Sequence, residues 1–346
     1  MNLETSRASP AGVTVPEPAG SLLHVKNLSV SFRDHRGWTQ VLDDVSLTVN
    51  PGEAVGVVGE SGSGKSVTSL AIMGLLPERQ ARRSGQILFQ GQDLVQLPES
   101  AMRKIRGRRI GMVFQEPMSA LDPVFTIGDQ IGEAIRAHFG GLNRAEVEER
   151  TLDALASVGI PSPRTHAASY PMSLSGGMRQ RVTIAMALVC EPALLIADEP
   201  TTALDVTIQA QIMDILLELT RKTSTAVMFI THNVGLVAQS CSRMVTMYAG
   251  HVMESAPVVQ SMSHPLHPYT AGLLACVPGS TPRKSLLPSI PGRVPSPDAM
   301  PTGCRFGPRC THAIERCHSR QELKAVGGSS VRCCRHGELQ LSGVGL

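Results

Sequence analysis

The chain has 346 residues, of which 42% are hydrophobic and 18% charged, and its formal net charge is +3. This length predicts two domains, or one large domain with an appendage, and the composition excludes collagen-like, coiled-coil and wholly disordered chains. The near balance of charge argues against a dedicated nucleic-acid-binding protein. Without a run of about 18 apolar residues or a secretory signal in residues 1–20, we expect a cytosolic protein that reaches a membrane only from its side.

Strands and helices are predicted to alternate along most of the chain. Strands are expected at 22–30, 41–49, 54–58, 86–89, 110–114, 193–197, 226–230, 244–247 and 251–254, and helices at 66–76, within 127–158, at 175–188 and at 208–221. Short apolar runs such as 54–58 are typical of buried parallel strands. The alternation predicts an α/β core with a mainly parallel sheet.

A glycine-rich loop follows the strand predicted at 54–58. Residues 59–66 (GESGSGKS) match G-x-x-x-x-G-K-[ST] at the mouth of a helix. The glycines allow successive N–H groups to face one concavity, and the helix N-terminus adds partial positive charge. Lys65 supplies a cation for the β- and γ-phosphates, and the Ser66 hydroxyl can ligate Mg²⁺. The loop therefore predicts a nucleotide phosphate site.

A second motif ends the strand predicted at 193–197. Residues 194–199 (LLIADE) place two carboxylates directly after an apolar run, which is costly unless the charges meet a cation. Asp198 is placed to hold Mg²⁺, through water, and Glu199 to orient and deprotonate an attacking water as general base.

Residues 174–181 (LSGGMRQR) form a third motif. Ser175 followed by Gly176 and Gly177 opens a helix and offers a second phosphate nest. Together with the two motifs above, this stretch resembles the signature of ATP-binding-cassette (ABC) ATPases. The resemblance implies that two chains meet head to tail, the signature of one closing on the nucleotide held by the other.

The resemblance also implies roles for isolated residues. Gln115 resembles the glutamine that contacts Mg²⁺ and the transmembrane partner, and His232 the switch histidine that contacts the γ-phosphate. Phe32 sits where the family stacks an aromatic ring on adenine, with Trp38 as a rival. The implied catalytic residues are Glu199, His232 and Gln115; the implied ATP-binding residues are Phe32, Gly59, Glu60, Ser61, Gly62, Ser63, Gly64, Lys65, Ser66, Val67, Ser175, Gly176, Gly177 and Asp205, the last in the loop that crosses the dimer interface; the implied Mg²⁺ ligands are Ser66, Gln115 and Asp198.

Met178 replaces the Gln of the commonest signature, and this variant resembles ATPase subunits of oligopeptide, dipeptide and nickel importers. Residues 115–123 (QEPMSALDP), 267–270 (HPYT) and 303–310 (GCRFGPRC) are similar to stretches in that group. The implied fold is an α/β P-loop NTPase of the ABC type, with a mainly parallel core, a small antiparallel β subdomain, a helical subdomain and a Cys-rich C-terminal extension. The expected domains are a flexible N-terminus at 1–20, the ATPase domain at 21–256 with its helical subdomain at about 116–175, a Pro-rich linker at 257–303 and the Cys-rich segment at 304–346.

Five of the eight cysteines crowd the last 43 residues. Their spacing is not the C-x2-C of a zinc ribbon, yet several thiols on a segment with little apolar core favour a metal site. Free structural thiols and zinc both remain open. The resemblance implies a [4Fe–4S] cluster held by Cys304, Cys310, Cys317 and Cys333, with Cys334 as an alternative to Cys333.

The favoured function is the ATP-hydrolysing motor of an ABC importer for oligopeptides or dipeptides, peripheral on the cytoplasmic face of the inner membrane. The implied partners are a second ABC ATPase subunit, identical or related, two transmembrane permease subunits and, indirectly, a solute-binding protein. One alternative is a soluble ABC ATPase that acts on nucleic acid or ribosomes, but the chain has one cassette and no heptad run between its ATP motifs. Another is a metal–sulfur redox sensor with a borrowed nucleotide fold, against which the intact Glu199 and His232 argue.

Overall fold

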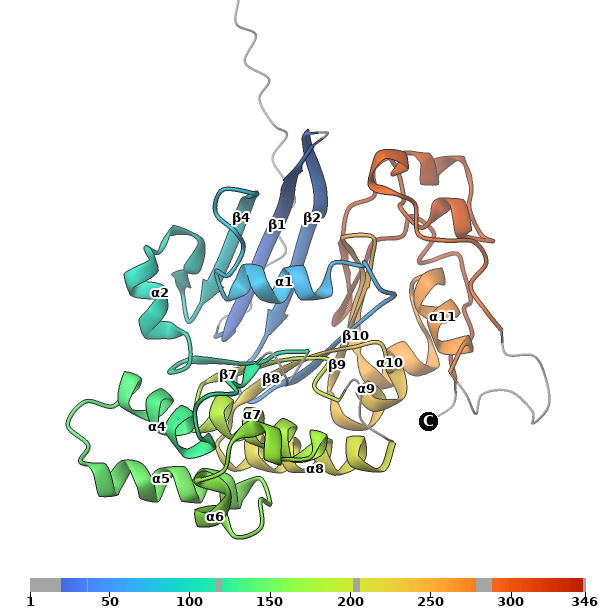
Figure 1. The fold of residues 1–346 in the computed structure, drawn as a ribbon. Coiled ribbons are helices and arrows are strands. Elements are labelled where there is room, and N and C mark those ends of the chain that lie inside the picture. Colours follow the sequence, from blue (N-terminus) through green and yellow to red (C-terminus); the bar gives the residue numbers. More distant parts are fainter. Residues whose placement is uncertain (1–19, 36, 116–119, 202–205, 278–287, 345–346) are drawn as a thin grey trace, which may run out of the picture.

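The computed structural model describes residues 20–35, 37–115, 120–201, 206–277 and 288–344. In these residues two β-sheets are surrounded by helices (Figure 1). The strand order is β11-β12-β10-β9-β3-β8-β7-β6 in the larger sheet and β2-β1-β4-β5 in the smaller. The larger sheet consists of β3 (Ala54–Val58), β6 (Ile110–Val113), β7 (Leu194–Asp198), β8 (Ala226–Thr231), β9 (Arg243–Tyr248), β10 (His251–Pro257), β11 (Lys324–Val326) and β12 (Ser329–Val331); the smaller consists of β1 (Leu23–Asp34), β2 (Gly37–Val49), β4 (Ala81–Phe89) and β5 (Gln92–Asp93).

The centre of the larger sheet is parallel. β3 pairs with β8 on one side and with β9 on the other, and β7 continues the parallel order from β8 to β6. These strands are apolar and buried, as expected for strands covered on both faces. The predicted α/β fold with a mainly parallel core is confirmed. Because parallel strands end at the same edge, β3, β7 and β8 deliver the residues after 58, 197 and 230 to one place.

The smaller sheet is antiparallel throughout, as predicted for the β subdomain. Between the two sheets lies α1 (Lys65–Ile72), which packs against β2 and β7 (Figure 1). The predicted helix at 66–76 was too long, because the chain turns at Gly74 with a φ of 62°. Strand β4 begins well before the predicted 86, since its polar first half pairs with β1 without any hydrophobic alternation.

Helices pack against the parallel core. The helical pattern predicted within 127–158 divides into α4 (Ile127–His138) and α5 (Arg144–Ser157), separated at the glycine pair 140–141. Local caps explain both starts: the Thr126 side chain accepts the N–H of Asp129, and Asn143 forms a capping box with Glu146. The remaining helices are α2 (Glu99–Ile105), α6 (Pro163–Ala167), α7 (Gly176–Leu188), α8 (Val206–Lys222), α9 (Val234–Ser240), α10 (Val258–Ser263) and α11 (Pro268–Ala275).

The C-terminal segment joins the main sheet. β12 pairs antiparallel with β10, and β11 forms a hairpin with β12. The helices α9 to α11 and these two strands were not predicted, because their apolar runs are short. In the described part of the chain, no helix combines the length and apolar character required to span a bilayer.

Candidate nucleotide-binding site

The phosphate-binding loop, residues 59–64, connects β3 to α1 as its motif predicts. Two positions require glycine. Gly59 has a φ of 155°, and a Cβ there would lie 2.1 Å from the carbonyl oxygen of Met247. Gly64 has a φ of 100°, and a Cβ there would lie 2.4 Å from Cδ2 of Leu42. The loop follows this tight path only with glycines, and it leads directly into the N-terminus of α1, where phosphate binding is favoured.

Lys65 is buried beneath this loop. Its Nζ donates to the carbonyl oxygens of Gly59 at 2.8 Å and Glu60 at 3.1 Å and lies 3.4 Å from Ser63 Oγ. Burial lowers the pKa of Lys65, while the carboxylate of Glu199 and the other nearby carboxylates oppose this shift. A partly desolvated ammonium folded back on its own loop is well placed to exchange carbonyl partners for phosphate oxygens.

Asp198 lies at the end of β7, directly beside α1. Its Oδ1 accepts a hydrogen bond from Ser66 Oγ at 3.2 Å, and its Oδ2 accepts one from Ser69 Oγ at 3.5 Å. Burial raises the pKa of Asp198, and the hydrogen bond from Ser66 opposes this shift. Sequence reasoning missed Ser69, although its place three residues after Ser66 puts both hydroxyls on one helix face.

Glu199 brings the three predicted catalytic residues together. Gln115 Nε2 donates to its Oε2 at 3.4 Å, and His232 Nδ1 lies 3.5 Å from its Oε1. The Glu199 backbone is in the left-handed region, with a φ of 47°, and its N–H donates to the carbonyl oxygen of Ile230 at 2.8 Å. A non-glycine residue held in this region is a local backbone strain of the kind that gathers at functional sites.

The other predicted ATP-binding residues near this loop differ in how far they are buried. Ser61 and Gly62 are exposed, Ser63 is buried, and Val67 packs against the core shared by the two sheets. Phe32 is half-buried against the same core.

Trp38, the rival to Phe32 for adenine, is 38% exposed. The guanidinium carbon of Arg82 lies 3.9 Å from its ring centroid. Both aromatic residues stay candidates for an adenine contact.

The signature residues Ser175, Gly176 and Gly177 stand at the start of α7 and not beside the phosphate-binding loop in sequence. Ser175 caps α7, and its Oγ accepts the N–H of Met178 at 3.3 Å. Gly176 and Gly177 form the first turn of this helix. Helix α7 packs against α4, α5 and α8, whereas α1 packs against β2 and β7. Asp205 lies outside the described residues.

The cysteine thiols of the C-terminal segment gather in one region. The pKa values of Cys304 and Cys333 are raised to about 11, chiefly by burial and in smaller part by nearby thiolates, Cys310 among them. The Sγ atoms of Cys317 and Cys334 are 3.7 Å apart. Within the described ranges, no group of three or more His, Cys, Asp or Glu side chains is arranged to hold a metal ion. The iron–sulfur cluster therefore stays a prediction.

Three buried arginines anchor the C-terminal segment to the nucleotide-binding core. Arg305 and Arg332 pair with Asp43 and Asp44 of β2, and Arg309 pairs with Glu60 of the phosphate-binding loop. Their side chains are between 2% and 7% exposed. Sequence reasoning missed these pairs, because each joins residues hundreds of positions apart. The sequence offered one sign of these pairs, which is that several arginines stand close to the cysteines.

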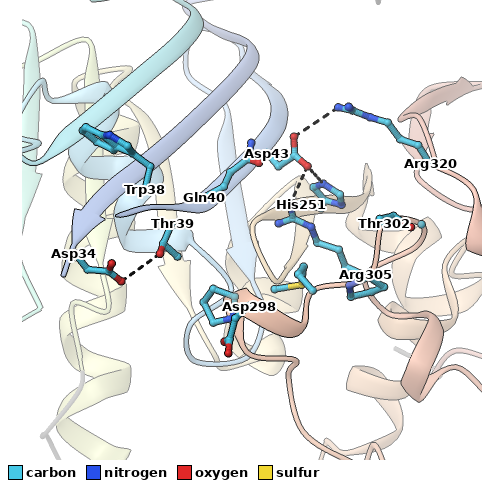
Figure 2. A pocket seen from close by; sticks show the side chains of 14 residues that line it. Asp34, Trp38, Thr39, Gln40, Asp43, His251, Asp298, Thr302, Arg305 and Arg320 are labelled. Atoms are coloured by element: carbon cyan, nitrogen blue, oxygen red, sulfur yellow. Dashed lines mark hydrogen bonds and ion pairs between the residues drawn. The ribbon is translucent and has the colours of Figure 1, made fainter. Parts of the chain in front are cut away.

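A cavity of about 600 Å³ opens between β2 and the C-terminal segment (Figure 2). Among its lining residues, Asp43 Oδ2 contacts His251 Nε2 at 3.0 Å and Arg305 Nη2 at 2.8 Å, and Asp43 Oδ1 lies 3.6 Å from Arg320 Nη2. The hydrogen bond with His251, together with the arginine charges, lowers the pKa of Asp43 to about 2. Burial lowers the pKa of His251 to about 4. The imidazole is therefore neutral at pH 7 and the carboxylate is charged. His251 belongs to β10, so it is Arg305 and Arg320 that tie the C-terminal segment to the β1–β2 hairpin.

Family models match two parts of the chain. Residues 42–202 match the ABC transporter family, and residues 253–317 match the C-terminal region of oligopeptide/dipeptide transporters. The first match contains the phosphate-binding loop, the signature and the Asp198-Glu199 pair. The second contains Arg305 and Arg309.

Relatives and solved structures agree with these matches. A protein of Brucella ovis named as a peptide import ATP-binding protein is 51% identical over 310 residues, covering 86% of this chain and 91% of its own. One of Brucella abortus is 46% identical, covering 93% and 97%. The ATP-binding cassette MJ0796, solved as a dimer bound to ADP and Pi, is 29% identical with a TM-score of 0.61, covering 68% of this chain and 98% of its own. The cbiO1 protein of Clostridium perfringens, part of the transporter complex cbiONQ, is 27% identical with a TM-score of 0.60, covering 70% and 90%. The chain therefore belongs to the ABC transporter family, as an ATP-hydrolysing subunit that carries the C-terminal region of oligopeptide/dipeptide transporters.

Proposed function

We propose that this subunit drives the import of oligopeptides or dipeptides from the cytoplasmic face of the inner membrane. The observation that carries the ATPase role is the contact of Glu199 with both Gln115 and His232, beside Asp198 and the buried Lys65. The names of the relatives support peptides as the cargo. The composition supports this function over action on nucleic acid or ribosomes, since the chain carries a small net charge.

The geometry supports a division of labour in hydrolysis. Lys65 exchanges the carbonyl oxygens of its loop for the β- and γ-phosphates of ATP. Ser66 and Asp198, already joined by a hydrogen bond, would hold Mg²⁺ with Gln115, and the metal would neutralise phosphate charge. Glu199 orients the attacking water and accepts its proton. His232, beside Glu199, donates a hydrogen bond to the γ-phosphate.

A second cassette, identical or related, completes each site in this proposal. The N–H groups of Gly176 and Gly177 at the start of α7 lack intrahelical partners by their position in the helix, and such groups bind phosphate. In the same chain α7 packs against β6, α4, α5 and α8, whereas α1 packs against β2 and β7. The signature of the opposite cassette therefore covers the γ-phosphate, and the dimeric cassette structure of MJ0796 supports this arrangement. Asp205 is proposed to contact the opposite cassette as well.

Two transmembrane permease subunits are proposed to dock beside α4. Val124 and Phe125 are 69% and 54% exposed, and Tyr170 and Met172 are 52% and 68% exposed. A hydrogen bond from the N–H of Ile127 to the carbonyl oxygen of Ser169 holds the two segments side by side. Large apolar side chains gathered at one exposed place are typical of protein interfaces. A solute-binding protein would act on the permeases from the other side of the membrane.

Charging this apolar surface is expected to uncouple the subunit from its permeases. Phe125→Asp with Met172→Asp should abolish co-purification with the permeases, because docking would then desolvate two unpaired carboxylates. Hydrolysis of ATP that the permeases stimulate in proteoliposomes should fall to the unstimulated rate. Val259→Asp on α10, at an apolar residue 65% exposed, is the matched control. Equal loss in both variants would contradict the docking site.

The cysteine segment is proposed to hold a [4Fe–4S] cluster through Cys304, Cys310, Cys317 and Cys333. Cys304 and Cys310 each lie near enough to Cys333 to raise its pKa, and Cys317 similarly affects Cys304 and Cys310. Cys thiolates are the ligands that hold [4Fe–4S] clusters, and these side chains lie within range of one another's charge. In this proposal the cluster stabilises the fold of the segment.

Protein purified without oxygen should contain about four iron and four acid-labile sulfide ions per chain. Cys304→Ser should lower both, whereas Cys190→Ser, at a buried cysteine outside the segment, should leave both unchanged. Zinc without iron in the wild-type protein would overturn the cluster assignment. The pair Cys333→Ser and Cys334→Ser decides which of the two adjacent thiols is the fourth ligand.

A further inference from the structure

Glu60, the second residue of the phosphate-binding loop, is held by three separate contacts. Its N–H donates to Tyr269 Oη at 2.9 Å, and its carbonyl oxygen accepts from Lys65 Nζ at 3.1 Å. Its two carboxylate oxygens accept from Arg309 Nη1 at 2.9 and 3.0 Å. Two of the three contacts thus come from residues beyond the cassette's own ATP motifs, and one of these comes from the cysteine-rich segment.

The position of Arg309 is set by the end of the Pro-rich stretch that precedes the cysteine-rich segment. Its Nε donates to the carbonyl oxygen of Pro291 at 2.8 Å and its Nη2 to that of Ile290 at 3.3 Å. It stands directly before Cys310, whose N–H closes a turn onto Gly307 at 3.1 Å. The guanidinium is a rigid fork that stays protonated, so fixing one edge of it also fixes the edge that faces Glu60.

The tyrosine contact depends on the same segment. Tyr269 is fully buried, with its ring centroid 4.7 Å from that of Tyr248 and 5.2 Å from that of Phe306. Phe306 also lies 5.3 Å from Tyr248 and belongs to the cysteine-rich segment. Arg309 Nη1 donates to Tyr248 Oη at 3.3 Å. Displacing the cysteine-rich segment would therefore disturb two contacts of Glu60, the direct one with Arg309 and the one with Tyr269, whose ring packs against Phe306.

The charge of Glu60 makes this arrangement relevant to ATP. Its carboxylate lies close enough to Lys65 to raise the pKa of that lysine, against the larger lowering by burial. A carboxylate beside a triphosphate repels it unless a cation compensates. Arg309 supplies that cation from a side chain only 5% exposed, where solvent screens little.

We propose that Arg309 is a positioning residue for the phosphate-binding loop: it fixes Glu60 and neutralises its carboxylate, so that ATP affinity depends on the cysteine-rich segment. This inference rests on the ATP site described above and goes beyond it. It does not require that the segment hold a metal. It assigns the C-terminal segment a direct part in nucleotide binding.

The test is the Kd of Mg·ATP measured by calorimetry, together with KM and kcat, on the full chain. Arg309→Met should raise Kd and KM about tenfold, or about 1.4 kcal/mol, and leave kcat at saturating ATP within about twofold. Glu60→Gln combined with Arg309→Met should bind ATP more tightly than Arg309→Met alone, because the uncompensated carboxylate is gone. Arg316→Met, at a 60% exposed arginine of the same segment, should bind ATP like the wild type.

Failure of the proposed function and failure of this inference give different results. A wild-type protein that does not bind ATP would contradict the proposed function itself. The inference would be overturned, and the proposed function left intact, by either of two results. One is wild-type ATP affinity in Arg309→Met. The other is a change in Kd on Glu60→Gln that is the same with and without Arg309→Met. If Arg309→Met does not fold, Arg309→Lys carries the same cycle, with a smaller expected rise in Kd of about threefold, since it keeps the charge but loses the fork.

Discussion

Glu199→Gln is expected to abolish steady ATP hydrolysis while ATP stays bound. Glutamine fills the same space and can still contact Gln115, but it cannot accept the proton of the attacking water. The contacts of Lys65 and Ser66 with the phosphates are untouched. We expect kcat to fall by about 10²- to 10⁴-fold, the range for loss of a general base, with the Kd of Mg·ATP unchanged or lowered. Single-turnover hydrolysis and calorimetry measure the two quantities.

The control for this substitution is Glu149→Gln, at an exposed glutamate of α5, which should hydrolyse ATP at the wild-type rate. Steady hydrolysis by Glu199→Gln at the wild-type rate would rule out Glu199 as the base. A matching loss of ATP binding would instead show that Glu199 holds the site together.

Lys65→Met is expected to remove ATP binding itself. Lys65 is 6% exposed and donates to the phosphate-binding loop at 2.8 and 3.1 Å. Methionine keeps the aliphatic length but offers no charge to the β- and γ-phosphates. We expect the Kd of Mg·ATP to rise about 100-fold, equivalent to about 2.7 kcal/mol, with hydrolysis lost at ordinary ATP concentrations. Calorimetric titration with Mg·ATP measures this change.

Lys104→Met, at an exposed lysine of α2, is the matched control and should leave the Kd unchanged. Comparing Lys65→Met with Glu199→Gln is a stricter test, because Lys65→Met should lose nucleotide binding and Glu199→Gln should keep it. Equal nucleotide affinity in Lys65→Met and the wild type would contradict the phosphate site.

The elements that could be predicted are those determined by a short stretch of neighbouring residues. The loop at 59–66 needs glycines at defined places, and a Cβ at Gly59 or Gly64 would clash in the structure. The buried strand Ala54–Val58 has the predicted bounds, because a short apolar run that leads into a glycine-rich loop is typical of a buried parallel strand. The strands predicted at 244–247 and 251–254 are likewise present, as the antiparallel pair β9 and β10.

What escaped prediction depends on contacts between distant residues. The pairing of β12 with β10 brings the last part of the chain into the main sheet, and three-residue strands carry almost no periodic signal. The buried pairs of Arg305, Arg309 and Arg332 with carboxylates span hundreds of residues. A lone arginine in the sequence is most often solvated, so only the fold shows that these are buried. Ser69 was missed for a simpler reason, since its motif ends at Ser66.

The most direct test of the composite ATP site is amide hydrogen exchange on the purified transporter complex carrying Glu199→Gln, with and without Mg·ATP. ATP is expected to slow exchange at two separate places, the loop 59–66 and the first turn of α7 at Gly176 and Gly177. Protection confined to the loop, with the amides of α7 exchanging as fast as without nucleotide, would contradict the composite site.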